Sequence, residues 1–320
     1  MNGAETFQSP MLVWNWTVAI YLFLLGISSG ATLIAVLFKR SSQKEDLKQS
    51  FLVRSAVVIA PISLTLGLII LIFHLTMPWR FWFLMFNYQP KSIMSFGVMM
   101  FQIYMGLLAL WFLIIYQDWV AKMVRRYVPA LAKVVKWVTD LSEKFENIIE
   151  LLLIFFAVAL GAYTGFLISV LISYPMLNNP VLPILFLASG TSSGIGALLI
   201  AVLVFGKLST HSREVHFLHR FETPTMLIEL FLIFAFCLGL WYGGGQKTAS
   251  LLNALNSVWG YVFYIGILGI GLLLPLIANA LAPYRLKHSK GFIVILALCG
   301  LFGVMCLRFF ILYAGQMTLA

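Results

Sequence analysis

The sequence predicts an all-α integral membrane protein with eight transmembrane helices. Of its 320 residues, 62% are hydrophobic and only 10% are charged. The apolar residues form runs of about twenty or more, the length a helix needs to cross a hydrocarbon core of about 30 Å. The predicted spans are residues 12–38, 56–77, 92–116, 148–173, 183–206, 223–243, 258–281 and 292–316.

The basic residues predict how these spans are oriented. Seventeen of the 21 lysine and arginine residues lie in alternate connections, and the other side has only Arg80, Lys91 and Lys247. Basic residues accumulate in cytoplasmic loops. We therefore expect a multi-pass membrane protein with eight crossings and both termini outside the cell interior. The formal net charge of +10 then indicates contact with an anionic leaflet rather than with nucleic acid. The basic connections are residues 39–55, 117–147, 207–222 and 282–291.

Residues 118–146 are too charged to cross the bilayer. Apolar and basic residues alternate at helical spacing on both sides of Pro129. This pattern is typical of an amphipathic helix that lies on a membrane surface. We expect an interfacial helix on the cytoplasmic leaflet, and the alternative is a helix that docks a partner protein. Because residues 1–10 contain no basic residue, no cleaved signal peptide is expected.

A weak internal repeat runs through the sequence. The segment GISSG at residues 26–30 is answered by GTSSG at residues 190–194, and Pro61 is answered by Pro224 at nearly the same offset. Spans four apart run in the same direction, which predicts a parallel repeat of two four-helix bundles. The first bundle would be residues 1–173, including the interfacial helix, and the second would be residues 174–320.

The two glycine-containing motifs are expected first of all to pack helices together. Small residues four apart allow the backbones of two membrane helices to approach closely. Ser189 and Ser193 lie in or beside the second motif, where their hydroxyl groups could also bind a ligand.

One cation lies inside the last span, at Arg308. An arginine at the centre of a bilayer costs about 2.5–3.5 kcal/mol on insertion scales, so its surroundings must compensate. Arg308 lies eight residues before Gln316, about 12 Å along a helix, which places it in the outer half of the membrane. Other polar residues expected near the middle or outer half are Asn15, Tyr21, His74 and Tyr163.

Two acids lie in the inner half, Glu222 and Glu229. They are seven residues apart and therefore project from nearly the same helix face. No carboxylate is expected at the depth of Arg308, so an ion pair with Glu229 is not expected. Arg308 would either extend towards the outer surface or donate to neutral oxygens of tyrosines, backbone carbonyls or a quinone. Glu150, at the cytoplasmic mouth of its span, is expected to be solvated.

The histidines and cysteines argue against a resident redox centre. A haem between helices usually needs two membrane histidines, and only His74 lies near the outer half of a span. His211, His216 and His219 are expected to be solvated loop residues rather than metal ligands. The three cysteines lie in apolar spans without a CxxC motif, so neither an iron–sulfur cluster nor a zinc site is expected.

Five motifs link the protein to a known family: YLFLLGISSG, SIMSFG, AYTGFLIS, NNPVLPILFLASGTSSG and LRFFILYAGQ. With these motifs in order, the sequence resembles the NrfD/polysulfide reductase membrane-subunit family over essentially its whole length. The segments FHLTMPWRFWFLMFNY and LRFFILYAGQMTLA are most similar to the branch serving formate-dependent cytochrome c nitrite reductase. Polysulfide-type members more often carry an aspartate where this protein has His74.

This resemblance implies a quinol-oxidising, multi-pass subunit of the bacterial cytoplasmic membrane, with both termini periplasmic and no terminal reductase activity of its own. Menaquinol, a diffusible substrate, would be oxidised near the periplasmic face. Its electrons would pass to a periplasmic four-cluster iron–sulfur subunit and then to multihaem cytochromes c that reduce nitrite to ammonium. The polar residues carried over are Tyr21, His74, Tyr163, Glu222, Glu229 and Arg308.

The mechanistic hypothesis assigns a role to each group. Tyr21, Asn15, His74, Tyr163 and Arg308 would bind the quinone, and catalysis would rest on His74, Tyr163 and Arg308. His74 would accept a proton, because histidine changes charge near neutral pH, and Arg308 would stabilise the resulting anion.

In the same hypothesis, Glu222 and Glu229 would form a proton pathway from the cytoplasmic side. The alternatives are an equivalent subunit of a polysulfide- or thiosulfate-type molybdoenzyme, a secondary transporter, and a purely structural anchor that binds quinone only as a lipid.

Overall fold

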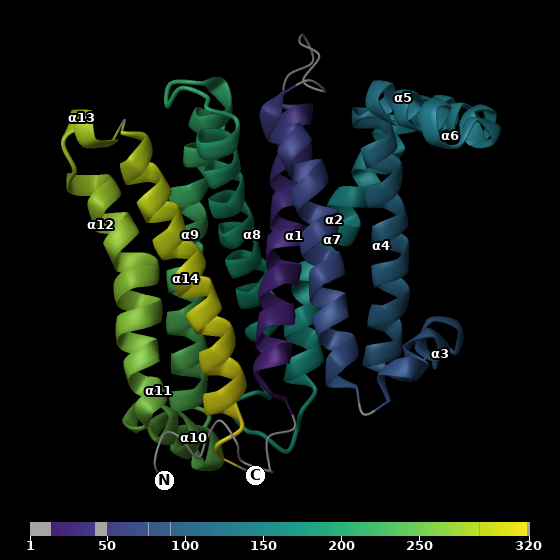
Figure 1. The fold of residues 1–320 in the computed structure, drawn as a ribbon. Helices are drawn as coiled ribbons and strands as arrows, with labels where there is room; N and C mark the ends of the chain where they lie inside the picture. Colours follow the sequence, from purple (N-terminus) through teal and green to yellow (C-terminus); the bar gives the residue numbers. More distant parts are fainter. Residues whose placement is uncertain (1–13, 42–49, 76, 90, 288, 319–320) are drawn as a thin grey trace.

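The structure, a computed structural model, describes residues 14–41, 50–75, 77–89, 91–287 and 289–318 (Figure 1). The predicted eight spans are confirmed, because these ranges contain eight apolar helices long enough to cross a membrane. They are α1 (Trp16–Arg40), α2 (Phe51–His74), α4 (Ile93–Ile115), α7 (Glu146–Ser169), α8 with its π-helical continuation η5 (Leu182–Phe205), α9 (Arg213–Trp241), α11–η6–α12 (Val258–Leu281) and α14 (Lys290–Gly315).

The sixth span begins about ten residues earlier than predicted. Helix α9 starts at Arg213, where the Ser212 hydroxyl accepts a hydrogen bond from the Val215 backbone N–H. A serine in this position satisfies one of the free N–H groups at a helix start. The apolar run predicts only the part of a helix that lies in lipid, so polar turns beyond the membrane are missed.

Short helices connect the spans at both ends of the bundle. Helices η3 (Pro78–Arg80), α3 (Phe81–Phe86) and α10 (Gly245–Asn256) lie at the lower end in Figure 1. Helices α5 (Gln117–Tyr127), η4 (Pro129–Leu131), α6 (Ala132–Lys144) and α13 (Tyr284–Lys287) lie at the opposite end. The four basic connections thus belong to one end of the bundle. That this end is cytoplasmic stays a prediction.

The expected interfacial helix is two helices rather than one. The break lies at Val128, whose backbone leaves the helical region at φ −140° and ψ 67°. Pro129 explains the break, because a proline disfavours the helical conformation in the residue before it and cannot donate a backbone hydrogen bond. Both α5 and α6 run across the direction of the spans, as Figure 1 shows.

The closest contact between the two halves of the protein is the crossing of α1 with α8. Gly26 and Gly190 face each other so closely that a Cβ on either would lie 3.2 Å from the Cα of the other. A Cβ on Gly30 would overlap the Gly190 carbonyl, and a Cβ on Gly194 would overlap the backbone at Gly30. The two repeated motifs therefore pack against each other, as expected for small residues.

Three of the serines around this crossing donate hydrogen bonds to carbonyl groups of their own helices. The Ser189 hydroxyl donates to the Phe186 carbonyl at 3.2 Å, and the Ser193 hydroxyl donates to the Gly190 carbonyl at 2.8 Å. Ser29 makes the corresponding bond to Gly26 at 3.1 Å. Because their hydroxyl groups are hydrogen-bonded to backbone carbonyls, these small polar side chains fit into a close helix interface.

The other helices pack around these two. In the first half, α1 contacts α2 and α7, and α4 also contacts both of these helices. In the second half, α8 contacts α9 and α14, and α14 packs along η6. The division into bundles at residue 173, and their relation by a parallel repeat, stay predictions.

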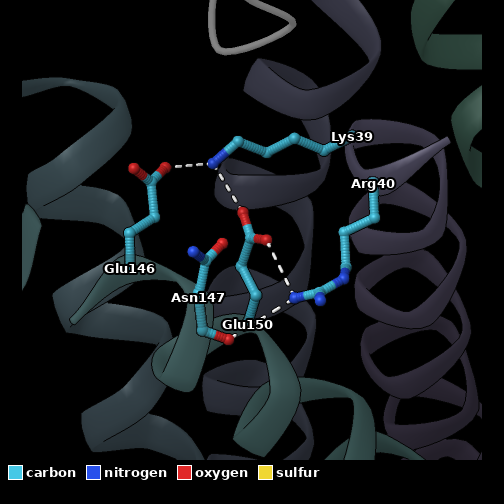
Figure 2. A network of polar contacts seen from close by, with 5 residues as sticks. All are labelled: Lys39, Arg40, Glu146, Asn147 and Glu150. Carbon is cyan, nitrogen blue, oxygen red and sulfur yellow. Dashed lines mark hydrogen bonds and ion pairs between the residues drawn. The ribbon is translucent and has the colours of Figure 1, made fainter. Parts of the chain in front are cut away.

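Glu150 is buried, so the expectation that it is solvated is wrong. Figure 2 shows its carboxylate between the Lys39 ammonium and the Arg40 guanidinium, the latter at 3.5 Å. Lys39 also pairs with Glu146, and Arg40 donates to the Asn147 carbonyl at 3.4 Å. The carboxylate can be buried because the basic end of α1 meets the acidic start of α7, a pairing between distant parts of the sequence.

We predict that Gly30→Ala destabilises the protein by about 1–3 kcal/mol, the usual cost of forcing a group into a well-packed interface. The new Cβ would meet the backbone of α8, which cannot move aside as flexible side groups do. Thermal unfolding in detergent measures the effect. Gly106→Ala is the matched control, because a Cβ there has no neighbour within 4 Å. Equal melting temperatures for the two variants would contradict the prediction.

Candidate functional site

A cavity of about 640 Å³ lies in the first half of the protein, at the end of the bundle that also holds α3. Helices α1, α2, α4 and α7 form its walls, and the α3 segment contributes to it from the connection between α2 and α4. Most of its lining is aliphatic, aromatic or methionine. The lining residues are Trp14, Val18, Tyr21, Leu68, Leu71, Ile72, His74, Leu75, Phe81, Met85, Met94, Val98, Phe101, Gln102, Met105, Tyr163 and Leu167.

Four side chains supply most of the polarity of this apolar cavity: Tyr21, His74, Gln102 and Tyr163. Its volume falls in the range of about 300–1,000 Å³ that is usual for small-molecule sites, in which a few polar groups orient an otherwise apolar ligand. Met94 and Phe81 are 51% and 37% exposed, so the cavity opens to the surroundings beside them. The arrangement suits a flat, lipid-soluble molecule with hydrogen-bonding oxygens.

Three aromatic rings from three helices meet at the inner wall of the cavity. The Phe101 ring lies edge-on to Tyr21, with ring centroids 6.1 Å apart, and edge-on to Tyr163, with centroids 5.8 Å apart. Edge-to-face pairs at this separation are favourable because the positive ring edge meets the negative ring face. Phe101 therefore fixes the directions of both tyrosines, which are almost fully buried.

Gly97 makes room for one of these tyrosines. A Cβ at this position would overlap the Tyr163 hydroxyl group. Gly97 of the SIMSFG motif on α4 thus packs against the hydroxyl end of Tyr163, which belongs to the AYTGFLIS motif on α7. Two motifs that are far apart in the sequence form one contact, and this contact decides where the phenol oxygen lies.

Gln102 connects the cavity to the segment that borders it. Its Nε2 donates to the Met85 carbonyl at 3.2 Å, and its Oε1 accepts from the Tyr88 hydroxyl. These bonds fix the end of the α3 segment to α4. We did not predict Gln102 as a site residue, although a lone amide within the apolar run 92–116 is a signal of the same kind as Tyr21 or Tyr163.

The remaining outer residues divide between the cavity and the helix cap. His74 is the last residue of α2 and lines the cavity. Asn15 does not line it. Its side-chain oxygen accepts from the Thr17 backbone N–H at 3.2 Å and caps the start of α1. A ligand-binding role for Asn15 stays a prediction.

Arg308 is buried outside the cavity, at the crossing of α1 with α8. Its guanidinium lies over the Phe186 ring at 3.8 Å from the centroid, and Nη2 donates to the Phe186 carbonyl at 3.2 Å. A Cβ on Gly26 would lie 3.6 Å from Nη2. The cation therefore faces α1 from the side opposite to the cavity wall formed by Tyr21. Its Nε and Nη1 have no hydrogen-bond partner within the described residues.

Glu229 is the acid whose charge acts on the Arg308 guanidinium. The two charges interact electrostatically, and Glu229 also interacts with the Ser192 side chain. The contacts found among the described residues include no ion pair between Arg308 and Glu229, and the glutamate Oε2 has no hydrogen-bond partner there. Glu229 and Arg308 thus interact electrostatically across the helix interface without forming an ion pair.

Glu222 lies two turns before Glu229 on α9 and pairs with a histidine. The His219 Nδ1 is 2.7 Å from Glu222 Oε2, and the glutamate side chain is only 4% exposed. The expectation of a solvated loop histidine is therefore wrong for His219, which lies within α9. Helix spacing explains the contact, because residues three apart are neighbours on a helix surface.

The predicted site residues thus fall into three groups. Tyr21, His74 and Tyr163 come together in the cavity. Arg308 and Glu229 lie in the interior between the two halves. The His219–Glu222 pair lies near the opposite end of the bundle from the cavity. Their roles in binding, catalysis and proton transfer stay predictions. Among the described residues, no three histidine, cysteine, aspartate or glutamate side chains gather as metal ligands would.

We predict that Gly97→Ala leaves the fold intact but weakens ligand binding in the cavity by roughly tenfold, about 1.4 kcal/mol. The new Cβ displaces the tip of the Tyr163 side chain rather than backbone, so the cost falls on the geometry of the cavity. Fluorescence titration with a hydroxyquinoline N-oxide, a quinone mimic, measures the affinity. Gly106→Ala on the same helix serves as the control, and equal affinities in both variants would refute the role of Gly97.

Comparison with known proteins supports the resemblance seen in the motifs. Residues 4–320 match the family model described as "Polysulphide reductase, NrfD". The sequence is 54% identical over 314 residues to the protein NrfD homolog of Haemophilus influenzae, and the match spans 98% of both proteins. It is 45% identical over 323 residues to protein NrfD of Escherichia coli, and that match spans 100% of both proteins.

A third relative has a different name. The sequence is 39% identical over 313 residues to the C subunit of polysulfide reductase from Wolinella succinogenes, a match that spans 97% of this protein and 96% of the relative. Eight apolar helices together with this kinship make it a multi-pass protein of the bacterial inner membrane. With the predicted resemblance confirmed, the protein belongs to the NrfD/polysulphide reductase family of membrane proteins.

Proposed function

We propose that this protein is the quinol-oxidising membrane subunit of a respiratory oxidoreductase, with menaquinol as its substrate. The observation that carries the proposal is the cavity of about 640 Å³, which combines an apolar lining with Tyr21, His74, Gln102 and Tyr163. A hydroquinone ring needs apolar contacts on its faces and hydrogen-bonding partners at its two oxygens. The subunit has no terminal reductase activity alone.

In this proposal, different residues of the cavity bind the quinol and accept its protons. Oxidation of a quinol to a quinone releases two electrons and two protons, so the site must remove protons from both oxygens. Tyr163 and Tyr21 orient the ring through their hydroxyl groups. His74, at the end of α2, accepts the two protons one after the other and passes each to the periplasmic side, and the two electrons pass to the partner subunit. A positioned base of this kind typically contributes about 10²–10⁴-fold to a rate.

Arg308 acts through its charge rather than by touching the substrate. It lies behind α1, with Gly26 on its side of the helix and Tyr21 on the cavity side. A positive charge in a low-dielectric interior favours negative charge that develops nearby. We propose that Arg308 stabilises the anion formed when the quinol loses its first proton, and that Glu229 sets how strong this field is.

We further propose that Glu222 and Glu229 carry protons from the cytoplasmic side. Intramembrane acids are functional candidates because their burial is costly. Glu222 is already paired with His219, whose Nδ1 lies 2.7 Å from the carboxylate. Glu229 lies two turns deeper on the same face of α9. The two protons released by oxidation come from the quinol itself, and turnover is electrogenic under this proposal because further protons cross from the cytoplasmic to the periplasmic side by way of Glu222 and Glu229.

The proposed partner is a periplasmic four-cluster iron–sulfur subunit, which delivers electrons to multihaem cytochromes c for nitrite reduction to ammonium. Identities of 54% and 45% to two proteins named NrfD, against 39% to the polysulfide reductase subunit, favour this branch. The alternative is the equivalent subunit of a polysulfide- or thiosulfate-type molybdoenzyme.

Complementing a strain that lacks the gene distinguishes the two, with growth measured first with nitrite and then with polysulfide as the electron acceptor. If the gene restores growth only with polysulfide as the electron acceptor, the nitrite assignment is overturned.

Reconstituted protein with its iron–sulfur partner tests the site. We predict that Tyr163→Phe and His74→Gln each lower menaquinol-driven reduction of the partner by roughly 10²-fold. For His74→Gln this is the lower range for a lost proton-transfer group, and for Tyr163→Phe it is the order expected when a substrate loses its orientation.

The control is Tyr104→Phe. Tyr104 is a buried tyrosine outside the cavity, and its hydroxyl donates to Thr32 at 2.7 Å. We expect it to retain the wild-type rate even if the melting temperature falls. Wild-type turnover in both Tyr163→Phe and His74→Gln would show that the cavity is not the site of oxidation.

A further inference from the structure

The α5–α6 hairpin, residues 117–144, extends sideways from the bundle. It connects the ends of α4 and α7, and in Figure 1 both of its helices run across the direction of the spans at the level where those spans end. None of the side chains of α5 is buried, and in α6 only Thr139 and Ser142 are. The quinol-oxidation proposal assigns no role to this hairpin.

Each helix of the hairpin has an exposed apolar stripe. On α5 the stripe is Trp119, Met123 and Tyr127, four residues apart, and on α6 it is Val134, Trp137 and Leu141. Residues at these spacings project from one face of a helix. Trp137 and Tyr127 are 66% and 67% exposed, so the stripes are uncovered in the isolated subunit.

A cleft of about 320 Å³ lies between the two helices, lined by charged side chains together with alanine and valine residues. Its charged side chains have both signs, and the described contacts include no ion pair among them. Given 100° per residue, Asp118 and Arg125 on α5 and Lys136 on α6 lie well over 90° around the helix axis from the middle of the stripe, whereas Lys133 and Asp140 border the stripe beside Trp137. A cleft with mixed charges suits water, and an aromatic stripe does not. The charged cleft residues are Asp118, Arg125, Lys133, Lys136 and Asp140.

Cations lie beside the α5 stripe. Lys122 and Arg126 each follow a stripe residue by three positions, which makes them its neighbours on the helix surface. The Arg126 guanidinium also lies 5.7 Å from the centre of the Tyr127 ring. A flank of basic groups next to exposed aromatic rings is complementary to phospholipid, whose phosphates lie just outside the acyl chains.

We propose that the α5–α6 hairpin is inserted into the surface of an anionic bilayer, with both stripes among the acyl chains and the cleft facing water. The occupant of the stripes is therefore phospholipid rather than a partner protein. Continuity with the lipid-facing surface supports this choice. Helix α7, which packs on α6, exposes Ile148, Leu151 and Phe155 at the adjoining end of its span.

Spin labels at neighbouring positions test this orientation in the full-length protein. In protein whose cysteines 237, 299 and 306 are replaced by alanine, labels are attached to Val134→Cys and Leu141→Cys on the stripe. Ala132→Cys and Lys136→Cys are the matched cleft positions, each two residues from Val134 and on the other side of α6. The protein is held in nanodiscs of phosphatidylcholine with or without phosphatidylglycerol.

With phosphatidylglycerol present, stripe labels should relax several-fold more with oxygen than with a water-soluble nickel chelate, and cleft labels should show the reverse. Without it, the contrast at the stripe should shrink. Lys122→Gln combined with Arg126→Gln should reduce the difference between the two lipid compositions.

Two outcomes would overturn the proposal. Stripe labels that react with the nickel chelate as strongly as cleft labels would place the stripe in water. Stripe labels shielded from both reagents would show a protein-covered face. Because all four positions lie far from the cavity, these readouts do not depend on quinol oxidation.

Discussion

The backbone contact between α1 and α8 is the constraint on which the arrangement of the protein depends. Inside a bilayer, helices gain little by hiding apolar side chains from apolar lipid, so close packing of small residues must hold them together. Gly26, Gly30, Gly190 and Gly194 let the two backbones touch. This contact joins the two halves of the protein and fixes the rotation of α1 about its own axis.

The rotation of α1 decides which polar groups meet. One side of the helix presents Tyr21 to the cavity, where Phe101 holds it and Tyr163 in place. The other side presents Gly26 to the Arg308 guanidinium, which the Phe186 ring and carbonyl bind. The face of α1 that carries Gly26 and Gly30 thus lets Arg308 approach closely. The neutral cavity and the buried charge lie on different sides of one helix and remain near each other. Under the proposed function, this separation lets Arg308 act on the quinol through its charge without occupying the cavity.

The number of helices and the role of the glycines could be predicted from the sequence, because lipid demands about twenty apolar residues per span and small residues mark close crossings. The meeting of Tyr21 with Tyr163 could not, since periodicity gives the face of a helix but not its neighbour. The burial of Glu150 was missed for the same reason, because its partner Lys39 lies on a helix far away in the sequence. Gln102 was overlooked although its polarity within an apolar span was visible.

Covalent labelling locates the substrate most directly. A photoreactive menaquinone analogue, irradiated with the assembled complex and followed by peptide mass spectrometry, reports which helices surround the ring. Labels on the cavity-lining faces of α2, α4 and α7, lost when excess menaquinone competes, are the predicted result. Competed labels confined to α8, α9 and α14 around Arg308 would place the ligand in the interior between the two halves and contradict the assignment of the cavity.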